Sequence, residues 1–174
     1  MSRLITLLLV ASFTGCGKGG DDGAPTAAKE PSWQSLASTG LEGLVPGDAK
    51  IEDEPSHHTV RIGATHWAAG LTVRSIAHTL APKTFEEARQ EIEKDSMNPL
   101  ERFTKEARTA DGWHFEYESG DAASKDSAES RYGLSIGRTI NGEAFQCYAT
   151  FLPKPADLLE MAAICRSLRA PAKP

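Results

Sequence analysis

Residues 131–152, RYGLSIGRTINGEAFQCYATFL, decide the fold of this chain of 174 residues. The dipeptide Asn141-Gly142 stands between two strand-like runs. Asn-Gly is the strongest short-range signal for a two-residue hairpin turn, because both residues accept positive φ angles. We therefore expect an antiparallel hairpin of residues 131–140 and 143–152. One face of its second strand should carry Phe145, Cys147, Ala149 and Phe151.

Further strands are expected on the N-terminal side of this hairpin. The runs 101–108 and 113–118 flank a tight turn at Ala110-Asp111-Gly112. In the second run, aromatic residues alternate with polar ones, which is typical of a sheet with one packed face. Three earlier runs, 49–54, 59–65 and 71–77, also have the composition and alternation of strands.

Two helices are predicted. Thr84 with Glu87 three residues later forms a capping box, in which two side chains satisfy otherwise unpaired amides of the first turn. This helix stops before Asn98-Pro99. The second helix, 155–168, begins with a proline, whose missing amide hydrogen costs nothing in the first turn. Its inner stripe is Leu158, Met161, Ala162, Cys165 and Leu168.

These elements predict one α+β domain over residues 41–171. Antiparallel neighbours joined by short turns make a twisted, mainly antiparallel sheet of about six or seven strands. Two helices with single apolar stripes must cover it. The expected order is three strands, a helix, three or four strands, and a helix.

The N-terminus, MSRLITLLLVASFTGC, has the layout of a secretory signal. Arg3 precedes about ten apolar residues, roughly half the length that spans a bilayer. Residues 13–16 resemble the lipobox of bacterial lipoproteins, although that family usually has an aliphatic residue in place of Phe13. The resemblance implies that residues 1–15 are removed, that Cys16 carries lipid, and, with Gly17 next, that the protein lies in the outer membrane of a Gram-negative bacterium, facing the periplasm. An ordinary secretory signal with a chance cysteine is the alternative.

Residues 16–40 are expected to be the lipidated cysteine and a flexible tether, since this segment is rich in Gly, Ala, Pro and charge. Trp33 either packs against the domain or contacts lipid or a partner. Without residues 1–15, 18 basic residues face 24 acidic ones, a formal charge of −6. Such acidity argues against nucleic acid as a partner.

With Cys16 assigned to lipid, two cysteines remain, one on a strand and one on the helix expected to pack over it. In an oxidising periplasm, a disulfide between Cys147 and Cys165 is the simplest interpretation, and a buried, unbridged pair is the alternative. No Cys-X-X-Cys spacing supports redox chemistry.

The sequence assigns no catalytic residue, metal site or cofactor, since no His-Glu-X-X-His or Gly-X-Ser-X-Gly motif is present. His57-His58 beside acidic residues could hold a metal, but a solvated turn is favoured, because neighbouring side chains of an extended chain point to opposite sides. His114 beside Glu116 could act as a base, but an exposed or helix-covered polar position is favoured. His66 and Trp67 are the candidates for an exposed partner contact, because packing does not obviously require a tryptophan in a turn.

Two runs of the sequence are similar to small uncharacterised lipoproteins of Gram-negative soil bacteria. The first extends from Thr84-Phe85-Glu86-Glu87-Ala88 to Asp111-Gly112-Trp113, and the second from Cys147-Tyr148-Ala149-Thr150 to Ile164-Cys165-Arg166-Ser167-Leu168. The layout resembles the PsbP-like α/β/α sandwich, known from an extrinsic photosystem subunit, a nuclear import factor and bacterial lipoproteins. This resemblance implies a non-catalytic module that binds larger assemblies.

Two functions follow as hypotheses. The favoured one is an accessory module that binds another envelope protein, and the second is a carrier of a small ligand or lipid with a pocket between the sheet and a helix. The first predicts an exposed apolar patch of several hundred Å², and the second an apolar cavity of about 300 Å³ or more.

Overall fold

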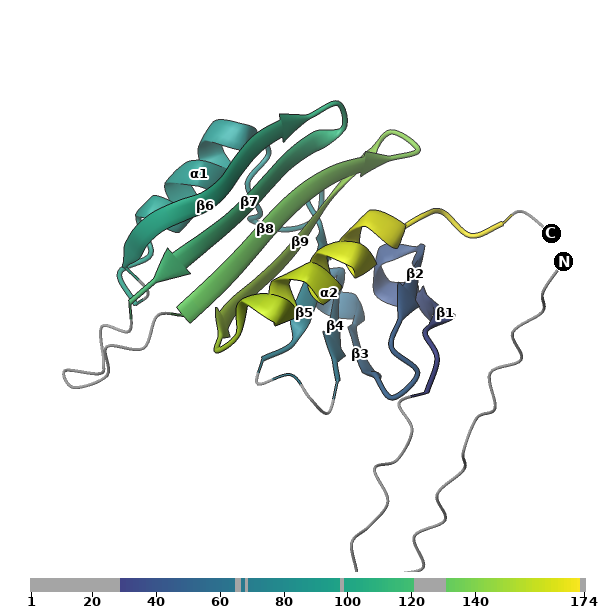
Figure 1. The fold of residues 1–174 in the computed structure, drawn as a ribbon. Coiled ribbons are helices and arrows are strands. Elements are labelled where there is room, and N and C mark those ends of the chain that lie inside the picture. Colours follow the sequence, from purple (N-terminus) through teal and green to yellow (C-terminus); the bar gives the residue numbers. More distant parts are fainter. Residues whose placement is uncertain (1–28, 65–66, 68, 98, 121–130, 173–174) are drawn as a thin grey trace, which may run out of the picture.

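The computed structural model describes residues 29–64, 67, 69–97, 99–120 and 131–172. Seven strands form one antiparallel sheet in the order β3-β4-β5-β9-β8-β7-β6 (Figure 1). They are β3 (Lys50–Glu54), β4 (Thr59–Gly63), β5 (Leu71–Ser75), β6 (Leu100–Thr109), β7 (Gly112–Ser119), β8 (Arg131–Ile140) and β9 (Glu143–Leu152). The helices are α1 (Phe85–Glu93) and α2 (Pro155–Ser167). The predicted class, α+β with an antiparallel sheet and two helices, is therefore confirmed.

The hairpin of β8 and β9 forms at the predicted residues. Asn141 and Gly142 take φ angles of 52° and 85°, as a two-residue turn of the mirror-image type requires. The predicted face of β9 is wrong at its end. A register shift inserts one extra residue in β9 between the pairs Leu134↔Ala149 and Tyr132↔Leu152. The shift leaves Phe151 exposed with φ 62° and buries Leu152 in its place.

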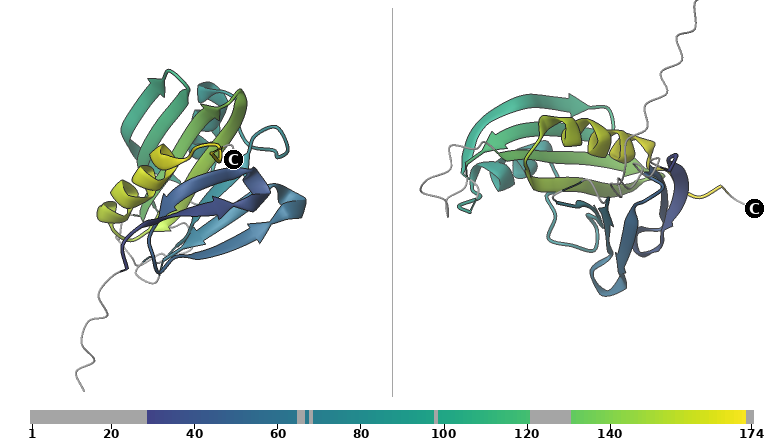
Figure 2. Two further views of the ribbon diagram at one scale, coloured as in Figure 1. Left: turned by 90° about the vertical axis from the view of Figure 1, so that its right-hand side faces the viewer. Right: turned by 60° about the horizontal axis from the view of Figure 1, so that its bottom comes forward.

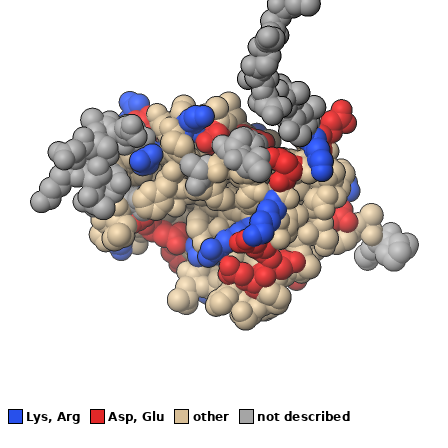
Figure 3. Space-filling view, turned by 90° about the horizontal axis from the view of Figure 1, so that it is seen from below, with Lys and Arg blue, Asp and Glu red and all other residues tan. Residues whose placement is uncertain are grey.

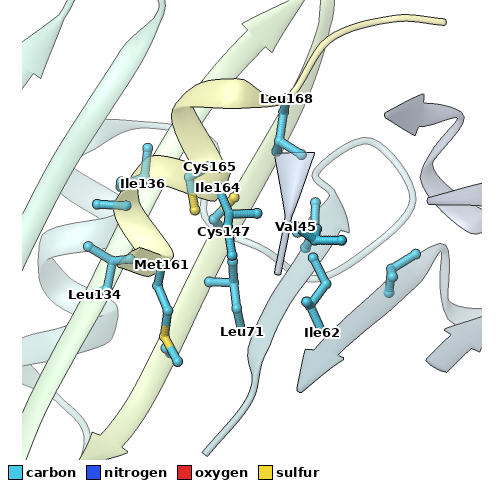
Figure 4. Packing of buried hydrophobic residues seen from close by; sticks show 14 of the residues in the cluster. Val45, Ile62, Leu71, Leu134, Ile136, Cys147, Met161, Ile164, Cys165 and Leu168 are labelled. Atoms are coloured by element: carbon cyan, nitrogen blue, oxygen red, sulfur yellow. The ribbon is translucent and has the colours of Figure 1, made fainter. Parts of the chain in front are cut away.

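The two helices cover opposite faces of the sheet. Helix α2 packs on the face that carries the larger apolar cluster, with residues from β4, β5, β8 and β9 (Figure 4). Helix α1 packs on the other face, over Trp113, Phe115 and Tyr117 of β7. Figures 1 and 2 show the sheet between the two helices. Neither helix has the length and apolar character needed to cross a bilayer, within the residues described.

Local sequence signals correctly predicted the start of α1 and the buried face of α2. The Thr84 hydroxyl accepts a hydrogen bond from the Glu87 amide at 3.1 Å. The Glu87 carboxylate accepts from the amide of Lys83, one residue earlier than a standard capping box predicts. All five residues of the predicted α2 stripe are buried.

Two strands precede those that the sequence predicts. β1 (Ser32–Leu36) and β2 (Leu41–Val45) form a separate antiparallel pair, joined by the 3-10 turn Ala37–Thr39. The expected tether therefore ends earlier than residue 40, and five strands precede α1 instead of three. Buried Leu36, Leu41 and Val45 attach the pair to the large core. Backbone hydrogen bonds in both directions between Glu42 and Arg169 fix it beside the end of α2.

Candidate functional site

The two faces of the sheet differ in chemistry. Under α2 the floor is apolar, because Val73, Cys147 and Ile136 lie on paired positions of β5, β9 and β8. The alternation of side chains places their neighbours Arg74, Gln146 and Ser135 on the face toward α1. The floor beneath α1 is therefore polar where the sheet passes from β5 to β8.

These polar side chains form a closed hydrogen-bond network. Gln146, which is 1% exposed, accepts from Arg74 Nε at 2.8 Å through its Oε1. Its Nε2 donates to Ser135 Oγ at 3.0 Å and to Glu91 Oε2 of α1 at 3.3 Å. Arg74 also donates to Glu91 Oε1 at 3.0 Å. Arg74, Gln146 and Glu91 thus each bond to the other two, and Ser135 bonds to Gln146, which fixes the geometry of the network.

Aromatic rings enclose the network. The Trp113 indole N–H donates to Ser135 Oγ at 3.2 Å, and the Arg74 guanidinium lies 4.6 Å from the centre of the Tyr148 ring. Burial raises the pKa of the Tyr117 phenol well above its usual value, and the nearby carboxylates of Asp95 and Glu91 add to this shift. The Tyr117 hydroxyl therefore stays protonated at neutral pH.

A pocket opens onto these residues. It has a volume of about 250 Å³, lies between α1 and the sheet, and is lined by the network together with Tyr117, Tyr148 and Thr150. A second hollow of about 550 Å³ shares Arg74 and Tyr148 with the first. We call the two together the polar groove. Its outer part runs between β4, the turn Pro55–His57 and the loop before α1.

The outer part of the groove contains histidines and mixed charge. His57 and His78 line it, and the His78 ring stacks on His58 with centroids 4.3 Å apart. Arg61 pairs with Glu54 at 3.3 Å. No group of three or more His, Cys, Asp or Glu in the described residues has the arrangement of a metal site, so His57 and His58 are not brought into one. Figure 3 shows basic and acidic side chains side by side on one face of the molecule.

His114 and Glu116 lie on the opposite face of the sheet from the polar groove. His114 is 7% exposed, and its Nε2 lies 2.7 Å from Glu116 Oε1. Burial and the charge of Lys105 lower the pKa of His114, and Glu116 opposes them. Glu116 also pairs with Lys105 at 3.6 Å. Of the two expected polar positions for His114, exposed or helix-covered, the exposed one is wrong, since the imidazole is buried.

The predicted partner contact at His66 and Trp67 is corrected in part. Trp67 is 8% exposed and belongs to the large apolar core. Its indole N–H donates to Glu160 Oε2 of α2 at 2.9 Å, so packing against α2 accounts for a tryptophan in this turn. His66 lies outside the described residues, as does Cys16.

The structure brings together the two residues of the predicted disulfide. Cys147 of β9 and Cys165 of α2 are buried free thiols whose side chains share a hydrogen bond (Figure 4). Burial and the adjacent Cys147 raise the pKa of Cys165. The bond between the two sulfur atoms stays a prediction.

A larger hollow lies elsewhere, at the N-terminal end of α1. It measures about 760 Å³ and reaches from Lys83 and Phe85 to Trp113. Its arginines are paired, as Arg74 of the groove is: Arg108 pairs with Glu86 and stacks on Phe85, and Arg138 pairs with Asp111. We prefer the smaller polar groove as the candidate site, because there buried hydrogen-bonding side chains converge on the cavity.

Sequence reasoning missed this groove. Its members come from β5, α1, β8 and β9, and only the fold brings them together. One signal was present, namely a glutamine in the middle of an apolar strand between Phe145 and Cys147. No protein-family model matches the chain, and no curated protein is significantly similar to it.

Proposed function

We propose that this chain is a lipid-anchored binding protein of the bacterial envelope that holds a small polar ligand in the polar groove and performs no catalysis. The observation that carries the proposal is the Gln146–Ser135–Arg74–Glu91 network facing a cavity, in which Gln146 and Ser135 are buried, Arg74 is partly buried and Glu91 is exposed. Convergent polar groups within a concave surface are the usual basis of ligand specificity.

The structure shifts the balance between the two functions that the sequence suggests. Among the exposed large apolar side chains of the described residues, Trp33 and Leu44 face each other across β1 and β2, and the others belong to separate elements or loops. This does not amount to an apolar patch of several hundred Å². The pocket between helix and sheet is present, but at about 250 Å³ it is small and polar groups make up about half of its lining, which favours a hydrogen-bonding ligand over a lipid.

The charges of the network constrain the ligand. Arg74 pairs with Glu91, Gln146 is neutral, and Asp95 also lines the inner pocket, so the pocket offers amide, guanidinium and hydroxyl groups with a small excess of negative charge. The Tyr148 ring adds a flat wall. A neutral or zwitterionic ligand with several hydroxyl or amide groups matches this surface, as a sugar or a short peptide would.

A thermal-shift screen tests the proposal. The mature chain is heated with a panel of amino acids, dipeptides, monosaccharides and disaccharides. A ligand present at 100 times its Kd stabilises the folded state by about 2.7 kcal/mol, which raises Tm by several degrees. The variant Arg74→Met should lose this rise. The matched control is Arg102→Met, which removes another Arg–Glu pair, with Glu118, outside the groove. No rise with any compound, or an equal rise in Arg74→Met, would contradict the proposal.

A protein partner is a second candidate, supported by Leu80. This residue is fully exposed, and it lies where the outer groove meets a further hollow beside α1. A photo-crosslinking amino acid at position 80 should capture one dominant envelope protein, and the same probe at exposed Leu159 of α2 should not. Equal capture from both positions would argue against a site at Leu80.

The membrane anchor and the finer fold class are also proposals. The lipobox-like residues support lipidation of Cys16 at the periplasmic face of the outer membrane, and Cys16→Ala should release the protein from membranes. Helices on opposite faces of an antiparallel sheet support a PsbP-like α/β/α sandwich (Figure 2). An experimental structure whose sheet order differs from that fold would refute this assignment.

A further inference from the structure

A second surface lies on the pair of strands where the described chain begins. Trp33 of β1 and Leu44 of β2 are direct cross-strand partners, and they are 44% and 37% exposed. Cross-strand partners point to the same side of a sheet, so the two apolar side chains lie next to each other. We call these residues, together with Arg169, the Trp33 patch.

Arg169 completes the patch. Its guanidinium lies 3.5 Å from the centre of the Trp33 ring, and it donates to Glu42 Oε2 at 3.3 Å. Hydrogen bonds between the backbones of Glu42 and Arg169, at 2.9 and 3.0 Å, hold this end of the chain in place. The exposed indole is therefore stacked on a fixed neighbour, which lowers the entropy that it would lose on binding.

Trp33 differs from the other two tryptophans. Trp67 and Trp113 are 8% and 4% exposed, and each donates its indole N–H to a partner inside the protein. Core packing accounts for those two. It accounts for Trp33 only in part, since nearly half of its surface faces solvent.

The position of the Trp33 patch in the chain, close to the proposed lipid anchor, favours a bilayer as the surface that covers it. Cys16, the proposed lipid anchor, lies 13 residues before Lys29, the first described residue, and Trp33 follows four residues later. Thirteen residues span at most about 45 Å, so an anchored domain stays within that distance of the bilayer at this end. Tethering gives even a weak membrane contact a high effective concentration.

The chemistry of the patch also fits a bilayer surface. Indole and guanidinium groups are enriched where one side of a molecule meets acyl chains and the other meets headgroups. Two apolar side chains and one arginine are far fewer than the 20 to 30 residues a side of a stable protein interface. The patch is adequate for orienting a domain that a lipid already holds.

We propose that Trp33, Leu44 and Arg169 form a membrane-orienting contact that seats the β1–β2 end of the domain on the phospholipid interface. This inference rests on the proposed lipid anchor at Cys16. The indole and Leu44 enter the headgroup region, and Arg169 faces lipid phosphate. The polar groove, on other elements of the domain, stays free to bind its ligand.

Fluorescence quenching tests the inference. The full lipidated chain is reconstituted into vesicles of phosphatidylcholine and phosphatidylglycerol with brominated acyl chains, which quench indoles that lie in the bilayer. We expect loss of the Trp33 emission, shown by comparison with Trp33→Phe. A Trp33→Phe/Leu159→Trp variant, with its indole at an exposed site on α2, should keep its emission.

The outcomes separate the inference from the anchor. Quenching of Trp33 together with flotation of the protein with the vesicles supports both. Flotation without quenching overturns the membrane-orienting contact and leaves the anchor intact, and the patch is then free for a protein partner. A chain that neither floats nor is quenched overturns the anchor and the contact together.

Discussion

Gly137 of β8 offers a sharp test of how α1's face of the sheet is packed. A Cβ atom at this position would lie 2.5 Å from three atoms of the Trp113 ring, so the indole occupies the space that a side chain would need. Gly133, four residues earlier, has the same relation to the Tyr117 ring, at 2.1 Å. The rings of β7 thus lie flat on the glycines of β8.

The substitution Gly137→Ala should force the indole out of its place. Overpacking of this kind costs about 1 to 3 kcal/mol. Displacing the indole also strains its hydrogen bond to Ser135, which contributes about 1 kcal/mol. The change from glycine to alanine also raises the free energy of unfolding by about 0.5 to 1 kcal/mol, because alanine restricts the unfolded chain more than glycine does. We expect a net loss of about 2 kcal/mol in the free energy of unfolding.

Urea denaturation measures the effect, with Gly63→Ala as the matched control. Gly63 ends β4, and a Cβ there would have no atom within 4 Å. That variant should be as stable as the parent, or more stable by about 0.5 kcal/mol. The double variant Trp113→Phe/Gly137→Ala, with a smaller ring, should lose less than the sum of its single changes. Equal stability of Gly137→Ala and Gly63→Ala would refute the packing that we describe.

Three further predictions concern other parts of the domain. Arg138 donates to three carbonyls at the C-terminal end of α2, so Arg138→Met should lower the free energy of unfolding by about 2 kcal/mol in urea denaturation. If Cys147 and Cys165 are bridged in the periplasm, reduction should raise the intact mass by two hydrogens and lower stability by about 3 kcal/mol, and an unchanged mass would exclude the bridge. Because the folded pKa of Tyr117 is raised, its contribution to stability is complete below the unfolded value of about 10 and is lost as pH rises above it. Absorbance near 295 nm should therefore show this tyrosine ionising together with unfolding.

Elements with strong local signals could be predicted from the sequence. Asn141-Gly142 fixed the turn and register of the central hairpin, and Thr84 with Glu87 fixed the start of α1. The α2 stripe followed from helical periodicity alone. In each case, the residues that determine the structure lie within a few positions of one another.

Elements that depend on distant contacts were missed. β1 has five residues, SWQSL, and lies in a segment whose overall composition is typical of a tether. Its pairing with β2, which is itself bridged to Arg169 through Glu42, makes it a strand. Trp67 was misplaced for the same reason, since its partner Glu160 lies 93 residues away. The polar groove likewise needs contacts between residues as far apart as Arg74 and Gln146.

The contrast between the two sheet faces bears on what the groove is for. The face under α2 supplies the larger apolar core, which includes β1 and β2, and its burial accounts for much of the fold's stability. A buried polar network adds little net stability compared with apolar side chains of similar volume, because desolvation offsets its hydrogen bonds. Folding alone therefore gives no reason for Gln146, Ser135 and Arg74 to stand beside the smaller apolar cluster under α1 in place of apolar residues. Binding does, because the same groups, already held in place by one another, meet a ligand without further ordering.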